Sequence, residues 1–251
     1  DVPYEKSEDA VRAVADELRG MTAFLEEVTG RKADGDALKA AVARSARSAE
    51  LYRAYCACGS RRLTGDLTSE MYLAFLSHIL LGTEETERFY EMLLRDRKNA
   101  PESGAKRILW LHIVPYLQPA VRELLNFSDR AFIASCELAY ESMIPMDPEK
   151  PYETMARRLV YSPYNGSPDI RIARALEMAK LTEADGAVLF AHWGCKGTLG
   201  ASRLLQKAME EAGVPTLILD GDGANPANTS DGQTATRLEA FLEMLEAKQS
   251  L

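Results

Sequence analysis

Four short apolar runs in the second half of the chain are separated by longer amphipathic stretches. The runs lie at 107–114, 131–135, 187–190 and 216–219. Each has the length and composition of a buried strand. The stretches between them are long enough for the crossover helices that neighbouring parallel strands require. This pattern predicts an α/β unit of the flavodoxin-like or Rossmann-like kind, with a parallel sheet of about four strands flanked by helices.

The first half of the chain carries helical patterns only. Ser7 is placed to cap a helix whose apolar stripe ends before Gly30, as helix start and stop signals require. Further helices are predicted over 36–56, 71–81 and 83–97. The composition of residues 99–104 is typical of a loop. We therefore expect an all-helical segment over residues 1–100 and a C-terminal α/β domain over residues 101–251.

Within the α/β domain, helical patterns begin at Pro119, at Ser167 and after Gly200, and a last helix begins near Ser230. Residues 137–151 differ from these stretches, because they have no clear period and contain three prolines. An irregular loop is predicted there, and long loops in compact domains are often functional.

Composition and charge exclude several classes of protein. The net charge of −8 argues against nucleic acid as the main partner, because phosphate-binding surfaces carry an excess of Lys and Arg. No apolar run approaches the length of about 18 residues that suggests a membrane span. Four cysteines in a chain of 251 residues do not suggest a disulfide scaffold, and the first residues lack a secretory signal pattern. We expect a cytoplasmic protein with reduced thiols.

Cys195 lies in the loop between the third predicted strand and the next helix. Ligands and chemistry collect in such loops at the carboxyl ends of parallel strands. A position just before a helix N-terminus and beside Lys196 favours the thiolate, which helps both metal ligation and nucleophilic attack. His192, three residues earlier, is placed either to share the site or to orient the loop by hydrogen bonding.

Three roles for the Cys195 thiol remain open. It can be an inert buried thiol. It can be a nucleophile on a sharp turn, for which Gly197 fits but Trp193 does not. It can also be a metal or iron–sulfur ligand, which requires partner cysteines, and Cys136 follows the second strand at the same edge of the sheet. A structural role is nevertheless the favoured interpretation of Cys136.

The other cysteines and histidines favour structural roles. Cys56 and Cys58 are separated by one residue, whereas zinc sites usually have two to four. His78 and His112 each stand alone in apolar segments, as satisfied core histidines do. The acidic run at 219–226 lacks the glutamate and glycine positions of a calcium loop. It predicts a tight turn at the sheet edge, in the same cleft as Cys195.

Several short motifs resemble the C-terminal signature of the 2-hydroxyacyl-CoA dehydratase subunits, which the related benzoyl-CoA reductase subunits share. They are HWGCK at 192–196, LILDGDG at 217–223, NTS at 228–230, GQ at 232–233 and TRLEAFL at 236–242. The sequences DVPY at 1–4 and EEVTGR at 26–31 resemble the junction and helical region of that family. The resemblance thus spans the chain, and we expect the chain to be part of a longer subunit.

The resemblance implies a lyase that eliminates water from a 2-hydroxyacyl-CoA thioester through a ketyl radical anion. It also implies two subunits, each with a [4Fe-4S] cluster held by three cysteines, and a separate ATP-hydrolysing iron–sulfur activator. Cys195 matches the last cluster cysteine, and His192, Trp193 and Lys196 would shape the cluster or thioester pocket. The other two ligands are expected outside this chain. A benzoyl-CoA reductase-like subunit and a cluster-free subunit-association domain remain alternatives.

Overall fold

The computed structural model describes residues 1–63, 71, 74–75, 78–115, 117–140, 144–228 and 230–247. In chain order, its elements are α1 (Glu8–Thr29), α2 (Gly35–Cys56), the 3-10 turn η1 (His78–Leu80), α4 (Glu84–Asn99), β1 (Lys106–Leu111), α5 (Pro119–Leu125), β2 (Ala131–Cys136), α6 (Glu137–Tyr140), α7 (Pro151–Val160), α8 (Pro168–Leu181), β3 (Gly186–His192), α9 (Lys196–Glu211), β4 (Thr216–Gly221), the 3-10 turn η2 (Pro226–Asn228) and α10 (Asp231–Ala247). The helix expected over 71–81 falls largely outside the described residues.

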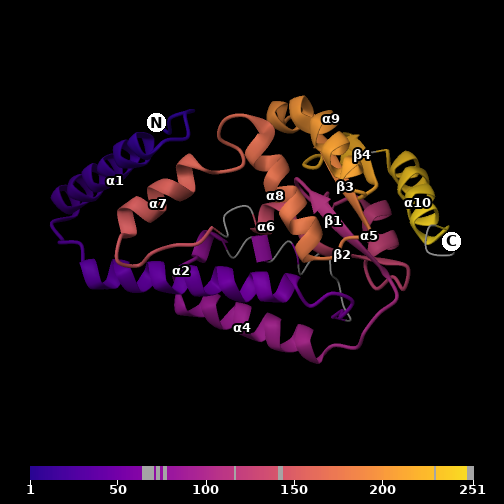
Figure 1. Ribbon diagram of the computed structural model, residues 1–251, viewed down its shortest axis with the longest axis horizontal. Helices are drawn as coiled ribbons and strands as arrows, with labels where there is room; N and C mark the ends of the chain where they lie inside the picture. The colour runs from indigo at the N-terminus through magenta and orange to yellow at the C-terminus, as the bar shows by residue number, and fades with distance from the viewer. Residues whose placement is uncertain are drawn as a thin grey trace.

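The predicted α/β fold is confirmed. All four predicted strands form, and they make one parallel sheet in the order β2-β1-β3-β4. Helices α5 and α10 pack together on one face of the sheet, and α8 and α9 pack together on the other (Figure 1). The direction of the strand order therefore changes between β1 and β3. In open α/β sheets, ligands bind in the crevice outside the carboxyl ends of the strands at such a switch point.

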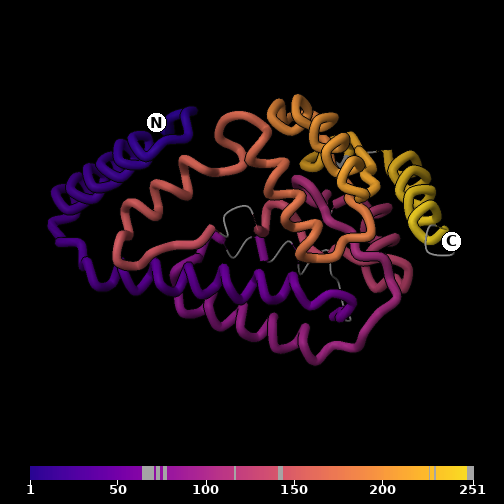
Figure 2. Tube along the Cα trace, viewed as in Figure 1, coloured from indigo at the N-terminus to yellow at the C-terminus, as the bar shows by residue number. Residues whose placement is uncertain are grey.

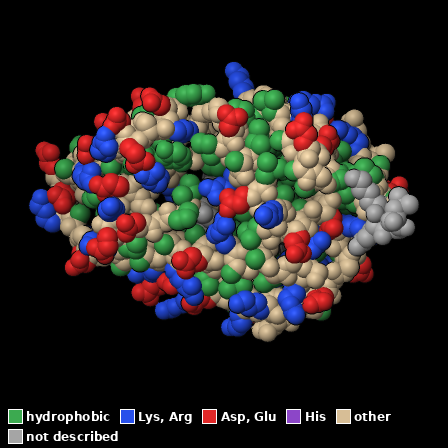
Figure 3. Space-filling view, viewed as in Figure 1, with side chains coloured by type: hydrophobic (Ala, Val, Ile, Leu, Met, Phe, Trp, Pro, Cys, Tyr) green, Lys and Arg blue, Asp and Glu red, His purple; other side chains and the backbone are tan. Residues whose placement is uncertain are grey.

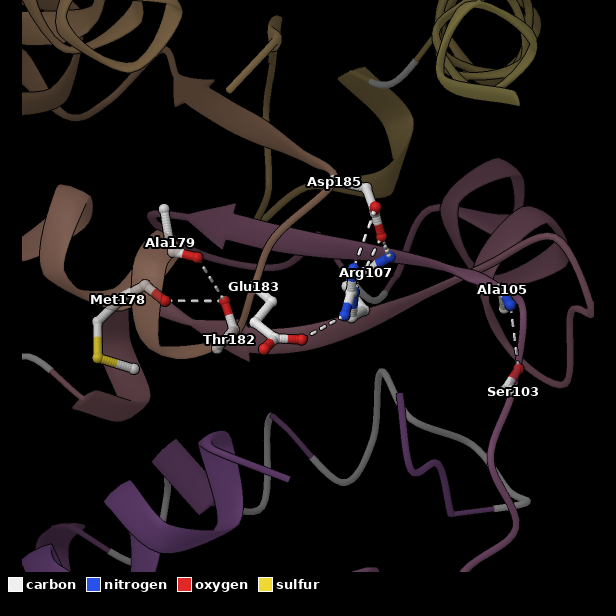
Figure 4. Close-up of polar contacts among 8 residues, drawn as sticks. All are labelled: Ser103, Ala105, Arg107, Met178, Ala179, Thr182, Glu183 and Asp185. Atoms are coloured by element: carbon white, nitrogen blue, oxygen red, sulfur yellow. Dashed lines mark hydrogen bonds and ion pairs between the residues drawn. The ribbon is translucent and has the colours of Figure 1, made fainter. Parts of the chain in front are cut away.

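A charged clamp joins β1 and β3 at their amino ends (Figure 4). The backbone N–H and the Nε–H of Arg107 both donate to Oδ2 of Asp185, at 2.8 and 3.0 Å. The Nη1 atom of Arg107 donates to Glu183 at 2.8 Å. These bonds fix the register of the two central strands at their amino ends, opposite to the carboxyl ends where the switch point lies.

One buried core combines the sheet with helices from the first half of the chain. Trp110 of β1 is fully buried, and Tyr52 of α2 and Tyr90 of α4 belong to the same cluster. The Tyr52 hydroxyl lies 3.2 Å from Oγ of Ser135 on β2, so α2 contacts the sheet directly. The division of the chain at residue 100 stays a prediction.

Helices α1 and α7 lie side by side at the end of the molecule away from β4 (Figure 2). Their contacts form a small apolar cluster of their own. The irregular loop expected over 137–151 is partly wrong, because α6 begins at Glu137, and α7, which begins at Pro151, has no counterpart among the predicted helices. Proline suits the first turn of a helix, where an N–H is not needed.

The predicted apolar stripe of α1 is buried over only half of its length. Val11 and Val14 are buried against α7, whereas Met21, Leu25 and Val28 are 54%, 49% and 66% exposed. Helix α7 has 10 residues and α1 has 22, so α7 is too short to cover the whole apolar stripe of α1.

One face of the molecule carries both signs of charge without segregation (Figure 3). Acidic and basic side chains are interspersed over the face shown in Figure 3. None of the helices in the described ranges is both long and apolar enough to cross a bilayer.

Candidate functional site

The candidate site lies at the carboxyl ends of β1 and β3, where the strand order reverses. His112 directly follows β1 and has a positive φ of 71°, a conformation that non-glycine residues adopt only when their surroundings impose it. Its Nδ1 atom lies 3.2 Å from the carbonyl oxygen of Phe190 on β3. His112 thus bridges the two strands that border the crevice, as a hydrogen-bonded buried side chain.

Cys195 is the N-cap residue of α9, and its side chain is partly buried. Its Sγ atom lies 3.3 Å from Oγ1 of Thr198 in the first turn of the helix. Burial alone would raise the pKa of Cys195. The hydroxyl and backbone N–H of Thr198 and the charge of Arg171 outweigh burial and lower this pKa below its ordinary value. The thiolate therefore forms more readily at this position than at an ordinary cysteine.

A buried ion pair lies behind Thr198. Arg171 of α8 donates from Nε and Nη2 to the two carboxylate oxygens of Glu137, at 2.7 and 2.8 Å. The two side chains are 4% and 2% exposed. Nη1 of Arg171 also lies 3.3 Å from Oγ1 of Thr198, and Glu137 accepts the backbone N–H of His112 at 2.7 Å. A continuous polar chain thus connects the end of β1 with the Cys195 loop.

Glu137 and Arg171 are not among the site residues predicted from the sequence. The sequence feature that could have indicated them is the position of Glu137, a charged residue directly after a fully buried strand. A buried charge at the carboxyl end of a parallel strand needs a partner at the same edge of the sheet.

His192 joins the Cys195 loop to the turn that follows β4. Its Nδ1 atom accepts the backbone N–H of Gly223 at 3.1 Å. The turn is held by Asp222, whose Oδ1 accepts the N–H groups of Ala224 and Asn225 at 2.9 and 3.1 Å. The tight turn expected at the sheet edge therefore lies against His192.

Lys196 and Trp193 lie beside different hollows. Lys196 and Arg171 line a cleft of about 340 Å³ between the start of α8 and the first half of α9, with Tyr164 and Leu204 as apolar walls. Trp193 is 54% exposed. It lines a smaller polar pocket of about 120 Å³ next to α10. Of the predicted site residues, His192 and Cys195 share one loop, and Lys196 adjoins the larger cleft.

The remaining cysteines do not join Cys195. Burial raises the pKa of Cys56 to about 11 and that of Cys136 to about 12. The Cys136 thiol donates to the carbonyl oxygen of His112 at 3.3 Å. Within the described ranges, no three His, Cys, Asp or Glu side chains are grouped to hold a metal ion. The described residues thus fit one thiolate ligand at Cys195, and a full set of cluster ligands does not come from them.

Comparison with known proteins agrees with this picture. The chain is 27% identical to the (R)-phenyllactyl-CoA dehydratase alpha subunit of Clostridium sporogenes, over 99% of the chain and 64% of that protein. It is 22% identical to the (R)-2-hydroxyglutaryl-CoA dehydratase subunit alpha of Acidaminococcus fermentans, over 98% of the chain and 54% of that protein. It thus spans between about half and two thirds of the length of each relative. The family model described as 2-hydroxyglutaryl-CoA dehydratase, D-component, matches residues 1–245, so the chain belongs to this family.

Proposed function

We propose that this chain is part of a subunit of an activator-dependent 2-hydroxyacyl-CoA dehydratase, a lyase that removes water from a 2-hydroxyacyl-CoA thioester. The observation that carries the proposal is the partly exposed Cys195 thiol, with its lowered pKa, at the switch point of a chain of this family. The names of both relatives describe alpha subunits of CoA-thioester dehydratases.

In this proposal, Cys195 supplies one thiolate ligand to a [4Fe-4S] cluster, and the other ligands come from outside the described residues. When bound, such a cluster would pass the low-potential electron from the activator to the thioester. Thr198 and Arg171 hold the thiolate in place, and the positive end of α9 stabilises its charge. The chain thus positions the ligand before any cluster is assembled.

The cleft beside Lys196 suits the acyl thioester. Gly197 and Gly200 line it without side chains, so a ligand can approach the backbone of α9 closely. Lys196 contributes positive charge, and Tyr164 and Leu204 contribute apolar surface for the acyl group. His192 ends β3 and Trp193 follows it, so both residues lie beside the Cys195 loop.

The partners in this proposal are a second dehydratase subunit and an ATP-dependent iron–sulfur activator, in the cytoplasm. The subunit designations of both relatives support a multi-subunit enzyme.

The test is Cys195→Ser in the complete two-subunit enzyme, reconstituted anaerobically with its activator. We expect bound iron and the dehydration rate to fall together. Cys58→Ser is the matched control, because Cys58 is also partly exposed but lies outside the switch point, and it should leave both quantities unchanged. Wild-type iron content and rate in Cys195→Ser would refute the assignment.

The incomplete ligand set favours a second candidate, a cluster-free domain that serves subunit association alone. Dehydration by the complete enzyme with unchanged iron in Cys195→Ser would support it. Product analysis with a 2-hydroxyacyl-CoA and an aromatic acyl-CoA separates a dehydratase from a benzoyl-CoA reductase-like enzyme.

A further inference from the structure

The hydrogen bond between His192 and Gly223 fixes the tautomer of the imidazole. A backbone N–H can only donate, so Nδ1 of His192, which lies 3.1 Å from the nitrogen of Gly223, must be the acceptor. The carboxylate of Asp222 is the competing partner of Nδ1, but its Oδ1 lies 3.8 Å away, beyond hydrogen-bonding distance. In the neutral ring, the proton therefore resides on Nε2.

The Nε2 atom lies over the loop that carries Cys195. A Cβ atom added to Gly194 would be 3.0 Å from Nε2 of His192, so the glycine leaves the room that the ring occupies. The His192 side chain is 22% exposed. No group within the described part of the chain accepts its Nε2–H, which leaves this donor for a bound molecule.

Because Gly223 has no side chain, its backbone N–H can come close to the imidazole ring of His192. A Cβ atom on Gly223 would lie 2.5 Å from Cδ1 of Ile113 and 3.1 Å from Cε1 of Phe190. The contact with Ile113 is closer than real Cβ contacts come, and the contact with Phe190 is tight, so a side chain at position 223 would displace its neighbours. The turn that supplies the N–H is in turn held by Asp222. The imidazole is thus held from its Nδ1 side by backbone that packs on the core.

We propose that His192 donates its Nε2–H to the carbonyl oxygen of the acyl thioester bound beside Cys195. This inference rests on the proposed function, in which the thioester carbonyl gains negative charge during the reaction. A preorganised neutral donor stabilises an oxygen on which charge develops, and it does so without reorientation of the donor. A neutral imidazole with a fixed tautomer meets this requirement.

Two substitutions separate the two nitrogen atoms of the ring. His192→Asn keeps an acceptor near the position of Nδ1 and removes the donor at Nε2. His192→Gln places an amide donor near the position of Nε2 and gives up the bond to Gly223. In the complete enzyme, we expect His192→Asn to lower kcat by about 10²–10³-fold with little change in KM, as loss of an oxyanion donor does. We expect His192→Gln to retain more activity than His192→Asn.

Two spectroscopic measurements report on the His192 donor directly. Nitrogen-15 NMR should show the proton of His192 on Nε2. Isotope-edited infrared spectroscopy of a bound thioester labelled at the carbonyl carbon should show a C=O stretch below that of the free thioester, and His192→Asn should reverse the shift.

The outcomes distinguish failure of the proposed function from failure of the proposed role of His192. A complete wild-type enzyme that neither binds nor dehydrates an acyl-CoA overturns the proposed function, and the role of His192 with it. A wild-type enzyme that dehydrates while His192→Asn keeps the wild-type kcat overturns the role of His192 alone. A proton found on Nδ1 has the same effect.

Discussion

Glu137→Gln is expected to lower the free energy of unfolding by about 3–5 kcal/mol, because it leaves the guanidinium of Arg171 buried without its counter-charge. The substitution preserves the size of the side chain, so the loss reports charge rather than packing. Both side chains of the pair are at most 4% exposed, and the contact is bidentate at 2.7 and 2.8 Å. Urea unfolding of the wild type and the variant, followed by circular dichroism, measures the difference.

Two controls test the cause of this loss. The double variant Glu137→Leu/Arg171→Met should cost much less than the sum of the two single losses, because replacing both partners of a buried pair by apolar residues removes the uncompensated charge. Glu211→Gln breaks the exposed pair with Lys207, whose side chains are 68% and 74% exposed, and should change stability by at most about 1 kcal/mol. A Glu137→Gln protein as stable as the Glu211→Gln control would contradict the assignment.

Cys195 should react with iodoacetamide at pH 7.5 at least about 100-fold faster than Cys56 or Cys136 in the folded, metal-free chain, because alkylation requires an exposed thiolate. Burial raises the pKa of Cys56 and Cys136 to about 11 and 12, so both remain thiols at that pH. Hydrogen bonds to Thr198 lower the pKa of Cys195 despite its partial burial. As the pH falls below 9, Cys195 should therefore keep its reactivity longer than an ordinary thiol. Mass spectrometry of the labelled peptides measures each rate.

Thr198→Val is the matched variant for this experiment. It keeps the shape of the side chain and removes the hydroxyl that lies 3.3 Å from Sγ of Cys195. The pH at which Cys195 reacts at half its maximal rate should move upward. Equal labelling of Cys195 and Cys58 in the wild type would show that the Cys195 thiol is not activated. An unchanged pH profile in Thr198→Val would show that the Thr198 hydroxyl does not lower the pKa of this thiol.

The sheet could be predicted from the sequence because each strand is defined locally. β2 is buried at every position, and strands buried on both faces are continuous apolar runs that need no alternation. Two crossover helices, α5 and α8, carry proline in their first turn and α9 follows the Cys195 loop, so the order of elements along the chain was also available.

Helix α7 and the buried ion pair could not be predicted in the same way. Residues 137–151 combine three prolines with no period, and α7 is held by contacts to α1, more than 120 residues earlier in the chain, as in the bond from Tyr152 to Thr22. Glu137 and Arg171 are 34 residues apart, and nothing local in either segment indicates that they meet. The positions of Cys195 and Glu137 directly after strands were local properties, whereas the partner of Glu137 was not.

The separate α1–α7 cluster divides the cooperativity of folding. Its buried residues are not shared with the core around the sheet, so the two helices can open together while the sheet and the Cys195 loop stay intact. Sub-global openings of this kind require less free energy than complete unfolding. The polypeptide then behaves as two coupled cooperative units. Its backbone amides should fall into a fast-exchanging class in α1 and α7 and a slow class in the four strands, and a single melting temperature would describe only the second.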